Sequence, residues 1–251
     1  MRGRVVLVTG GTDGVGWALA QRLVDEGARV VVCGRDEARV ARVGHHLADS
    51  GLALRADVTD AEDCARVVEG TLERFGRLDA LVNNAGRSLA LAVAQASDDE
   101  WRADLELKVI AAQRLARLCW SALIENGGSI VNVLAISART PGANSTPTAA
   151  SRAAGLALTK ALSREGAPHG VRANAVLIGL IESGQWERRA ALSGESLEDF
   201  YRRRAREDQV PLGRFGRPEE FADLVSFLVS PRASYLTGVG ISLDGGLSPA
   251  I

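Results

Sequence analysis

Short apolar runs recur along the whole chain between longer amphipathic stretches, and this alternation most constrains the fold. The runs of strand length cover residues 5–9, 29–33, 52–56, 80–83, 129–134, 172–177 and 239–243. They are apolar nearly throughout, as a sheet buried on both faces requires. Helices between successive strands imply right-handed crossovers. The pattern therefore predicts an α/β fold of the Rossmann type, doubly wound, with a seven-stranded parallel sheet and helices on both faces.

A glycine-rich turn, 9–16, follows the first strand and precedes an amphipathic helix expected over 17–26. Gly10 permits the tight turn, Gly14 lets the backbone approach a pyrophosphate, and Gly16 lets helix and strand pack closely. The N-terminus of the helix then faces the phosphates. This order of strand, turn and helix predicts a dinucleotide site. Its predicted turn residues are Gly10, Thr12, Asp13, Gly14, Val15 and Gly16.

Further motifs extend the match over nearly the whole chain. They are Asp57-Val58, Asn83-Asn84-Ala85-Gly86, Ser129-Ile130-Val131-Asn132, the stretch 167–174, Pro211-Leu212-Gly213-Arg214 and Asp244-Gly245-Gly246. With the glycine turn, they resemble the short-chain dehydrogenase/reductase family, in the branch that includes β-ketoacyl-ACP reductases. The resemblance implies that Asp57 and Val58 hold the adenine and that Asn84, Ala85 and Gly86 line the ribose side. It also implies that the 178–183 loop, with Gly179, Ile181 and Ser183, meets the nicotinamide.

The end of the second strand indicates which cofactor the chain prefers. An acid there accepts the adenosine ribose hydroxyls and repels a 2′-phosphate, whereas this chain has Cys33-Gly34-Arg35, with an arginine able to pair a phosphate. We therefore expect NADP(H) in preference to NAD(H). The charge of Asp13 in the glycine turn opposes that preference. An alternative is that Arg35 only caps the strand end and that the pocket holds no dinucleotide.

The four catalytic positions of the family are all replaced. The resemblance implies a tyrosine acid, a lysine four residues later, a serine and an asparagine. Aligned on Asn132 and on 153–155, these positions become Thr148, Arg152, Ala135 and Lys108, respectively. No shift of register restores the motif, because the only tyrosines, Tyr201 and Tyr235, have no lysine four residues later.

The replacements argue against the usual ketoreductase mechanism. An aliphatic hydroxyl such as Thr148 is a much weaker acid than a phenol, and Arg152 stays protonated and is a poor proton donor. General acid catalysis contributes about 10²- to 10⁴-fold to a rate, so its loss is large. Thr148 and Arg152 nevertheless lie four residues apart on one predicted helix face. With Lys108 they form a polar set, which we take as the candidate catalytic residues.

Three functions fit this sequence. The first is a divergent NADP(H)-dependent oxidoreductase acting on a small organic carbonyl, imine or enone, with a proton from water, from the substrate or from Tyr201. The second is a non-redox enzyme, such as an isomerase, dehydratase or cyclase, in which Lys108 and Arg152 stabilise an oxyanion. The third is a nucleotide-binding pseudoenzyme.

Residues 182–209, rich in Glu and Arg, interrupt the rhythm after the sixth strand. An insertion at the carboxyl end of a strand lies over the crevice where α/β sheets bind ligands, which favours a mobile lid. A solvated helical excursion fits equally well. We expect a single dinucleotide-binding domain over 1–251, since the length suits one large domain and not two.

Composition excludes several partners. The net charge of −1 and the scattered arginines give no nucleic-acid stripe, and no apolar run reaches the roughly 18 residues of a membrane span. Three distant cysteines indicate neither a metal site nor a disulfide framework, so a cytoplasmic protein with a small-molecule substrate is expected. The resemblance implies a homo-oligomer, a tetramer or dimer, through 97–125, 146–168 and 244–251.

Overall fold

The seven predicted strands form one parallel sheet in the computed structural model, which describes residues 1–250. The strands are β1 Val5–Thr9, β2 Arg29–Gly34, β3 Gly51–Arg55, β4 Ala80–Asn83, β5 Ser129–Ala135, β6 Arg172–Ile178 and β7 Gly240–Leu243. Their order across the sheet is β3-β2-β1-β4-β5-β6-β7. The order therefore reverses between β1 and β4, and a crevice for ligands forms at the carboxyl ends of the strands on either side of such a point. The predicted Rossmann-type fold is confirmed.

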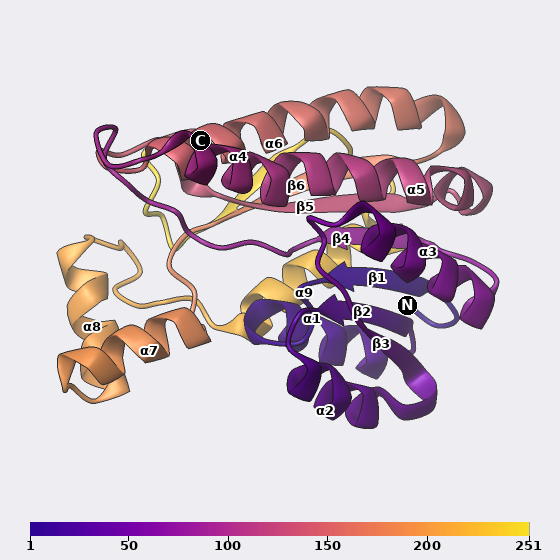
Figure 1. Ribbon diagram of the computed structural model, residues 1–251, viewed down its shortest axis with the longest axis horizontal. Coiled ribbons are helices and arrows are strands. Elements are labelled where there is room, and N and C mark those ends of the chain that lie inside the picture. The colour runs from indigo at the N-terminus through magenta and orange to yellow at the C-terminus, as the bar shows by residue number, and fades with distance from the viewer. Residues whose placement is uncertain (251) are drawn as a thin grey trace.

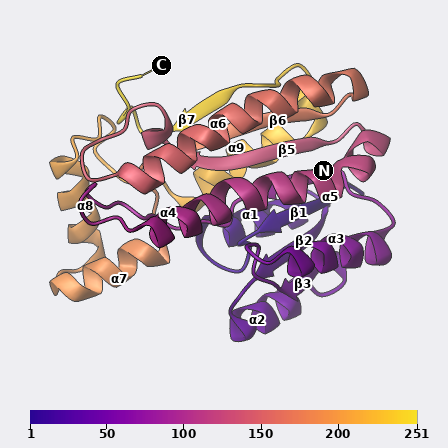
Figure 2. The ribbon, with the colours of Figure 1, turned by 45° about the horizontal axis from the view of Figure 1, so that its top comes forward.

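Helices cover both faces of the sheet (Figures 1 and 2). They are α1 Gly14–Asp25, α2 Glu37–Leu47, α3 Ala61–Phe75, α4 Asp98–Leu105, α5 Ala111–Asn126, α6 Thr146–Gly166, α7 Gly184–Ser193, α8 Leu197–Glu207 and α9 Pro218–Val229. One face packs against α1, α2 and α9, and the other against α3, α5 and α6. The expected start of α1 at residue 17 is wrong. The helix begins at Gly14 because the Asp13 carboxylate accepts a hydrogen bond from the Gly14 N–H at 2.9 Å.

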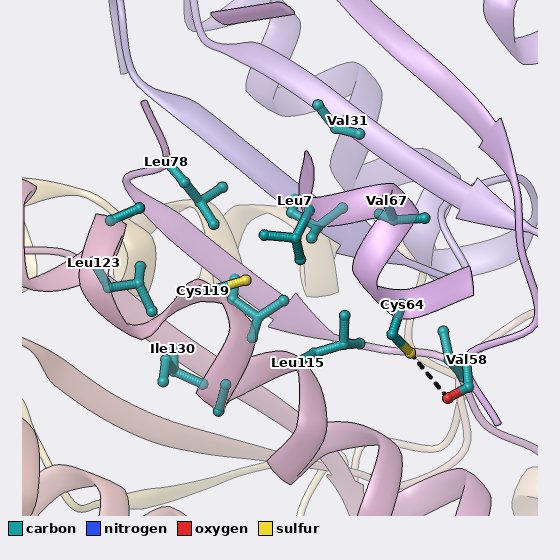
Figure 3. Packing of buried hydrophobic residues seen from close by; sticks show 14 of the residues in the cluster. Leu7, Val31, Val58, Cys64, Val67, Leu78, Leu115, Cys119, Leu123 and Ile130 are labelled. Carbon is teal, nitrogen blue, oxygen red and sulfur yellow. Dashed lines mark hydrogen bonds between the residues drawn. The ribbon is translucent and has the colours of Figure 1, made fainter. Parts of the chain in front are cut away.

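The two helical layers explain why the strands are apolar in nearly every position. Along β1, Val5 and Leu7 face the core under α3 and α5, whereas Val6 and Val8 face the core under α1 and α9. Both faces therefore need apolar side chains. Figure 3 shows the first of these cores, where the Cys64 thiol also donates to the Val58 carbonyl at 3.2 Å. That bond ties the loop after β3 to α3.

The segment 182–209 is mostly helical and projects beyond the layers of the sheet as α7 and α8 (Figure 1). A small apolar cluster joins it to the residues that follow, since Ala205, Trp186 and Tyr201 pack with Val210 and Phe215. Movement of this segment as a lid stays a prediction. Within residues 1–250, no helix is long and apolar enough to cross a membrane.

Several leucines in the segments expected to form an oligomer interface, 97–125 and 146–168, pack against the core of this chain. Leu115 of α5 is buried, and Leu118 and Leu158 pack against the same cluster. Leu156 packs against the small cluster that contains Leu134. The predicted homo-oligomer therefore stays a prediction.

Candidate active site

A cleft of about 790 Å³ opens where β1, β2 and β3 end, at the carboxyl edge of the sheet. The predicted cofactor residues that line it are Gly10, Thr12, Asp13, Arg35, Asp57, Val58, Ala85 and Gly86. Sequence reasoning missed other lining residues, among them Gly34, Arg39, Arg87 and Glu106. Glycine and small residues dominate the floor near β1, which leaves backbone groups open to a ligand.

The glycine turn is packed too tightly for side chains. Gly10 has a φ of +62°, and a Cβ there would lie 3.0 Å from the Ala85 Cα. A Cβ on Gly16 would lie 2.4 Å from the Gly10 carbonyl oxygen. Asn84 supports the turn from below, because its side-chain amide donates to the carbonyls of Thr9 and Gly10 at 2.9 and 3.1 Å. The residues thus fit a cradle for a pyrophosphate, and the Asn84 side chain shapes that cradle.

The region expected to meet a 2′-phosphate holds two arginines. Arg35 is exposed, with its guanidinium 3.8 Å from the Asp57 carboxylate. Arg39, from the first turn of α2, forms an ion pair with Asp13. The charge of Asp13 is therefore matched by a cation that the sequence reasoning did not consider. A Cβ on Gly34 would lie 2.5 Å from Thr12 Oγ1, so this strand end has no space for the carboxylate side chain that would favour NAD(H).

The predicted nicotinamide loop follows β6. A Cβ on Gly179 would lie 2.6 Å from the Asp244 Cβ, so the loop and the segment after β7 are in close contact. The Ile181 side chain is 4% exposed and packs into the core, and the expected contact of this loop with the nicotinamide stays a prediction. Ser183 precedes α7, and its Cβ lies 4.0 Å from the position that a Cβ on Gly14 would take. Of these three loop residues, only Ser183 brings a polar side chain toward the glycine turn. Val15, in the glycine turn, packs against the core.

Thr148, at the start of α6, has a cation beside its hydroxyl. Lys108 Nζ donates a hydrogen bond to Thr148 Oγ1 at 2.8 Å and a second one to the Asp104 carboxylate. The Lys108 side chain is 1% exposed. Lys108 lies in a π-helical turn, Glu106–Ile110, that joins α4 to α5. Such turns are frequent at functional sites. The structure therefore brings two of the predicted catalytic residues together across two helices.

Arg152 is turned away from Thr148. Its Nη1 donates to the Val133 carbonyl at 2.7 Å, while its buried Nε has no hydrogen-bond partner within residues 1–250. A Cβ on Gly86, which lines the cleft, would lie 3.3 Å from the second terminal nitrogen, Nη2. The shared helix face with Thr148 thus gives Arg152 no contact with the hydroxyl. Arg152 instead places a cation beside Gly86 at the edge of the cleft.

Burial lowers the pKa values of both Lys108 and Arg152. Burial, and then the charge of Arg152, lower the pKa of Lys108 to about 8, although the hydrogen bond to Asp104 raises it. Burial also lowers the pKa of Arg152 to about 10, which still leaves the guanidinium charged at neutral pH. A group with a pKa near the working pH is best suited to give up a proton in catalysis. Lys108 meets that condition, and Arg152 does not.

Tyr201, considered above as a proton source, has a different place. Its ring packs 4.7 Å, centroid to centroid, from Phe215 inside the cluster of α7 and α8. Burial, and then Glu182, raise the pKa of its phenol. Its environment therefore disfavours ionisation, which argues against a proton donor at this position.

Comparison with known proteins agrees with the resemblance seen in the sequence. A family model described as enoyl-(acyl carrier protein) reductase matches residues 10–248. The chain is 32% identical, over 248 residues and 98% of each chain, to the 3-oxoacyl-(acyl-carrier-protein) reductase FabG of Vibrio harveyi.

Solved structures agree in fold over almost the entire length. A short chain oxidoreductase from Pseudomonas aeruginosa PAO1, bound to NADPH and containing an atypical catalytic center, has a TM-score of 0.94 at 35% identity and covers 99% of this chain and 98% of that one. L-sorbose reductase from Gluconobacter frateurii, complexed with NADPH and L-sorbose, has a TM-score of 0.95 at 31% identity, with 100% and 98% covered. The sheet, the glycine turn and these likenesses together establish that the chain belongs to the short-chain dehydrogenase/reductase family.

Proposed function

We propose that the protein is an NADP(H)-dependent oxidoreductase that reduces a small organic carbonyl, imine or enone with Lys108 and Thr148 as its proton donors. The observation that carries the proposal is the 2.8 Å hydrogen bond from Lys108 Nζ to Thr148 Oγ1. It gives a weakly acidic hydroxyl an adjacent ammonium group whose pKa lies near 8. The hydroxyl and its cation, which the sequence separates by 40 residues, are neighbours in the fold.

The cleft fits the dinucleotide that the proposal requires. Backbone groups of Gly10, Thr12 and Asp13 would lie along the pyrophosphate, and Asp57 and Val58 would meet the adenine. Arg35 would pair a 2′-phosphate, as would Arg39 on release from Asp13. NADPH-bound relatives with the same fold support this choice of cofactor. When bound, the cofactor supplies a hydride.

The chain's own residues supply the proton. Thr148 Oγ1 accepts from Lys108, so its own hydroxyl hydrogen is free to donate to the oxygen or nitrogen on which negative charge develops. As that proton leaves Oγ1, a proton from Lys108 Nζ replaces it, and Lys108 is left neutral. The acid is thus an ammonium group acting through a hydroxyl, which removes the objection that a threonine alone is too weak. Arg152 keeps a fixed positive charge beside Gly86 on the ribose side.

The first test is direct titration with NADPH and NADH, following energy transfer from the four tryptophans to the nicotinamide. We expect tighter binding of NADPH, and a loss of that preference in Arg35→Ala. Arg29→Ala is the matched control, because Arg29 is an exposed arginine at the opposite end of the same strand. No binding of either cofactor in either redox state would contradict the proposal and favour a repurposed pocket or pseudoenzyme.

Turnover then separates the proposed activity from non-redox chemistry. The protein is incubated with NADPH and a panel of carbonyl, imine and enone compounds, and both cofactor oxidation and product are measured. We expect product and NADP⁺ in equal amounts. Product that forms without cofactor oxidation would instead support the isomerase, dehydratase or cyclase alternative.

A further inference from the structure

Asp104 connects the two helices that carry the proposed proton donors. It lies on α4, four residues before Lys108, and its side chain is fully buried. One oxygen, Oδ1, accepts a hydrogen bond from Lys108 Nζ. The other, Oδ2, accepts from the Ser151 hydroxyl of α6 at 2.6 Å. Ser151 Oγ also lies 3.1 Å from the backbone carbonyl of Thr148. Both oxygens of the carboxylate therefore have a donor.

We propose that Asp104 is a positioning residue that holds Lys108 against Thr148, and that Ser151 fixes Asp104 for this purpose. The inference rests on the proposed function, in which Lys108 is the proton source. An ammonium group on a flexible four-carbon stem has no preferred direction of its own. Here the bonds to Asp104 and Thr148 occupy two of its three donors and set that direction. Ser151 prevents the carboxylate from rotating away.

Asp104 also opposes the positive charges around Lys108. The charged groups that face Lys108 are Asp104 on α4, Arg152 on α6 and Arg87 in the segment before α4. Burial and both arginines disfavour the ammonium form, and Asp104 alone among these groups favours it. A buried carboxylate in direct contact thus keeps the proton donor charged near neutral pH. Without it, a much smaller fraction of Lys108 would carry a proton under the same conditions.

The chain offers an unusually clear test, because it contains only two lysines, Lys108 and Lys160. Labelling with ¹³C-lysine gives two sets of side-chain signals, and Lys160→Arg assigns them. In Asp104→Asn we expect the pKa of Lys108 to fall by about 1–3 units, the effect of an opposite charge in contact. Asp79→Asn is the matched control, since Asp79 is equally buried and pairs with Arg77 at the start of β4. It should leave the titration of Lys108 unchanged.

Turnover provides a second readout that a purely structural role would not move. If the pKa of Lys108 falls by about 1–3 units from about 8, the protonated fraction at pH 8 falls about 5- to 500-fold. We expect kcat of Asp104→Asn to fall by that factor at pH 8, with much of the loss recovered near pH 6 and KM little changed. Ser151→Ala keeps the carboxylate charge, so it should lower kcat with a smaller shift of the pH profile. Ser163→Ala, a buried serine farther along α6, is its control.

Each outcome has a separate meaning. An unchanged pKa of Lys108 in Asp104→Asn, or a rate loss that is the same at every pH, would overturn the inference. If Asp104→Asn does not fold, the decision passes to Ser151→Ala, where wild-type kcat and an unaltered Lys108 titration would overturn it. A shifted titration in a protein that turns over no substrate would support the positioning role and refute the proposed function.

Discussion

Replacing the buried ion pair by Asp104→Asn with Lys108→Met tests how much the fold loses by keeping a charged lysine inside. The fall in the pKa of Lys108 from 10.5 to about 8 corresponds to roughly 3 kcal/mol of unfavourable free energy for the protonated form. Because the folded pKa lies below the unfolded one, the unfolded chain binds more protons between pH 8 and 10.5. The free energy of unfolding of the wild type therefore rises with pH across that window. The unfavourable free energy of the buried, protonated Lys108 is fully present below pH 8.

The double variant lacks this titration, so the comparison isolates it. We expect the free energy of unfolding of the variant, relative to wild type, to fall by roughly 3 kcal/mol between pH 7 and 10.5. The variant removes both charges of the buried pair, so it leaves no uncompensated buried charge, and the amide introduced by Asp104→Asn keeps Ser151 as a hydrogen-bond partner; we therefore expect it to fold. Urea unfolding at four pH values measures the difference, and groups outside the pair cancel. Lys160→Met removes the exposed lysine as a control, with an expected effect within about 0.5 kcal/mol. A difference that is constant with pH would refute the reasoning.

Two further substitutions test the hydroxyl and the cradle. Thr148→Val removes the proposed donor at nearly constant volume, so we expect kcat to fall by about 10²- to 10⁴-fold while NADPH affinity is kept; stopped-flow turnover and fluorescence titration check both, and an unchanged kcat would contradict the assignment. Gly16→Ala would place a methyl group 2.4 Å from the Gly10 carbonyl oxygen, so we expect a lower Tm and weaker NADPH binding. Gly142→Ala, where the added group meets open space, is the matched control for thermal denaturation and cofactor titration. Equal behaviour of the two glycine variants would be inconsistent with a tight cradle.

The sheet was predictable because its signal is local. Strands β1, β2, β4, β5 and β6 are buried along most of their length, and the edge strands β3 and β7 are mostly half-buried. Each appears in the sequence as a short apolar run, and the predicted limits lie within one residue of those observed. The start of the first helix was not predicted correctly, because a single side chain determines it. Asp13 caps α1 and starts it at Gly14, ahead of the apolar pattern that begins at Trp17. The dinucleotide site was predicted in the same way, because the residues of a glycine turn lie next to one another in the sequence.

The contacts that decide the chemistry are not local. A π-helical turn between α4 and α5 positions Lys108 to hydrogen-bond Thr148. The spacing of apolar residues in the sequence does not predict that turn. The pairing of Asp104 with Lys108 was partly predictable, because an acid four residues before a lysine is a favourable helical pair. The burial of Asp104 was not predictable, because it depends on packing against α6. Asp13 lies in the glycine turn and Arg39 in α2, and the two meet only in the folded chain, where both line the cleft. Pairings of this kind depend on packing and were beyond the sequence patterns.

If Thr148 and Lys108 act together as proposed, a final prediction follows for the tyrosine position. In the family the cation beside the catalytic hydroxyl is expected from the residue four positions later, whereas the cation hydrogen-bonded to the Thr148 hydroxyl is Lys108, from the π-helical turn between α4 and α5. Restoring only the tyrosine, as Thr148→Tyr, should therefore not restore the family's mechanism, because Arg152 is bonded to the Val133 carbonyl and stays protonated.

The larger ring would also be forced into a site where Thr148 is already buried, and such overpacking costs about 1–3 kcal/mol. We expect Thr148→Tyr to have a lower Tm and a lower kcat than wild type, measured by thermal denaturation and by NADPH oxidation with whichever panel compound the wild type reduces. A single tyrosine that raised kcat would show that Lys108 and Asp104 are dispensable, because the phenol would then act without them. A decrease in kcat larger than the loss of stability explains would agree with a hydroxyl, a lysine and a buried carboxylate that depend on one another through their shared hydrogen bonds.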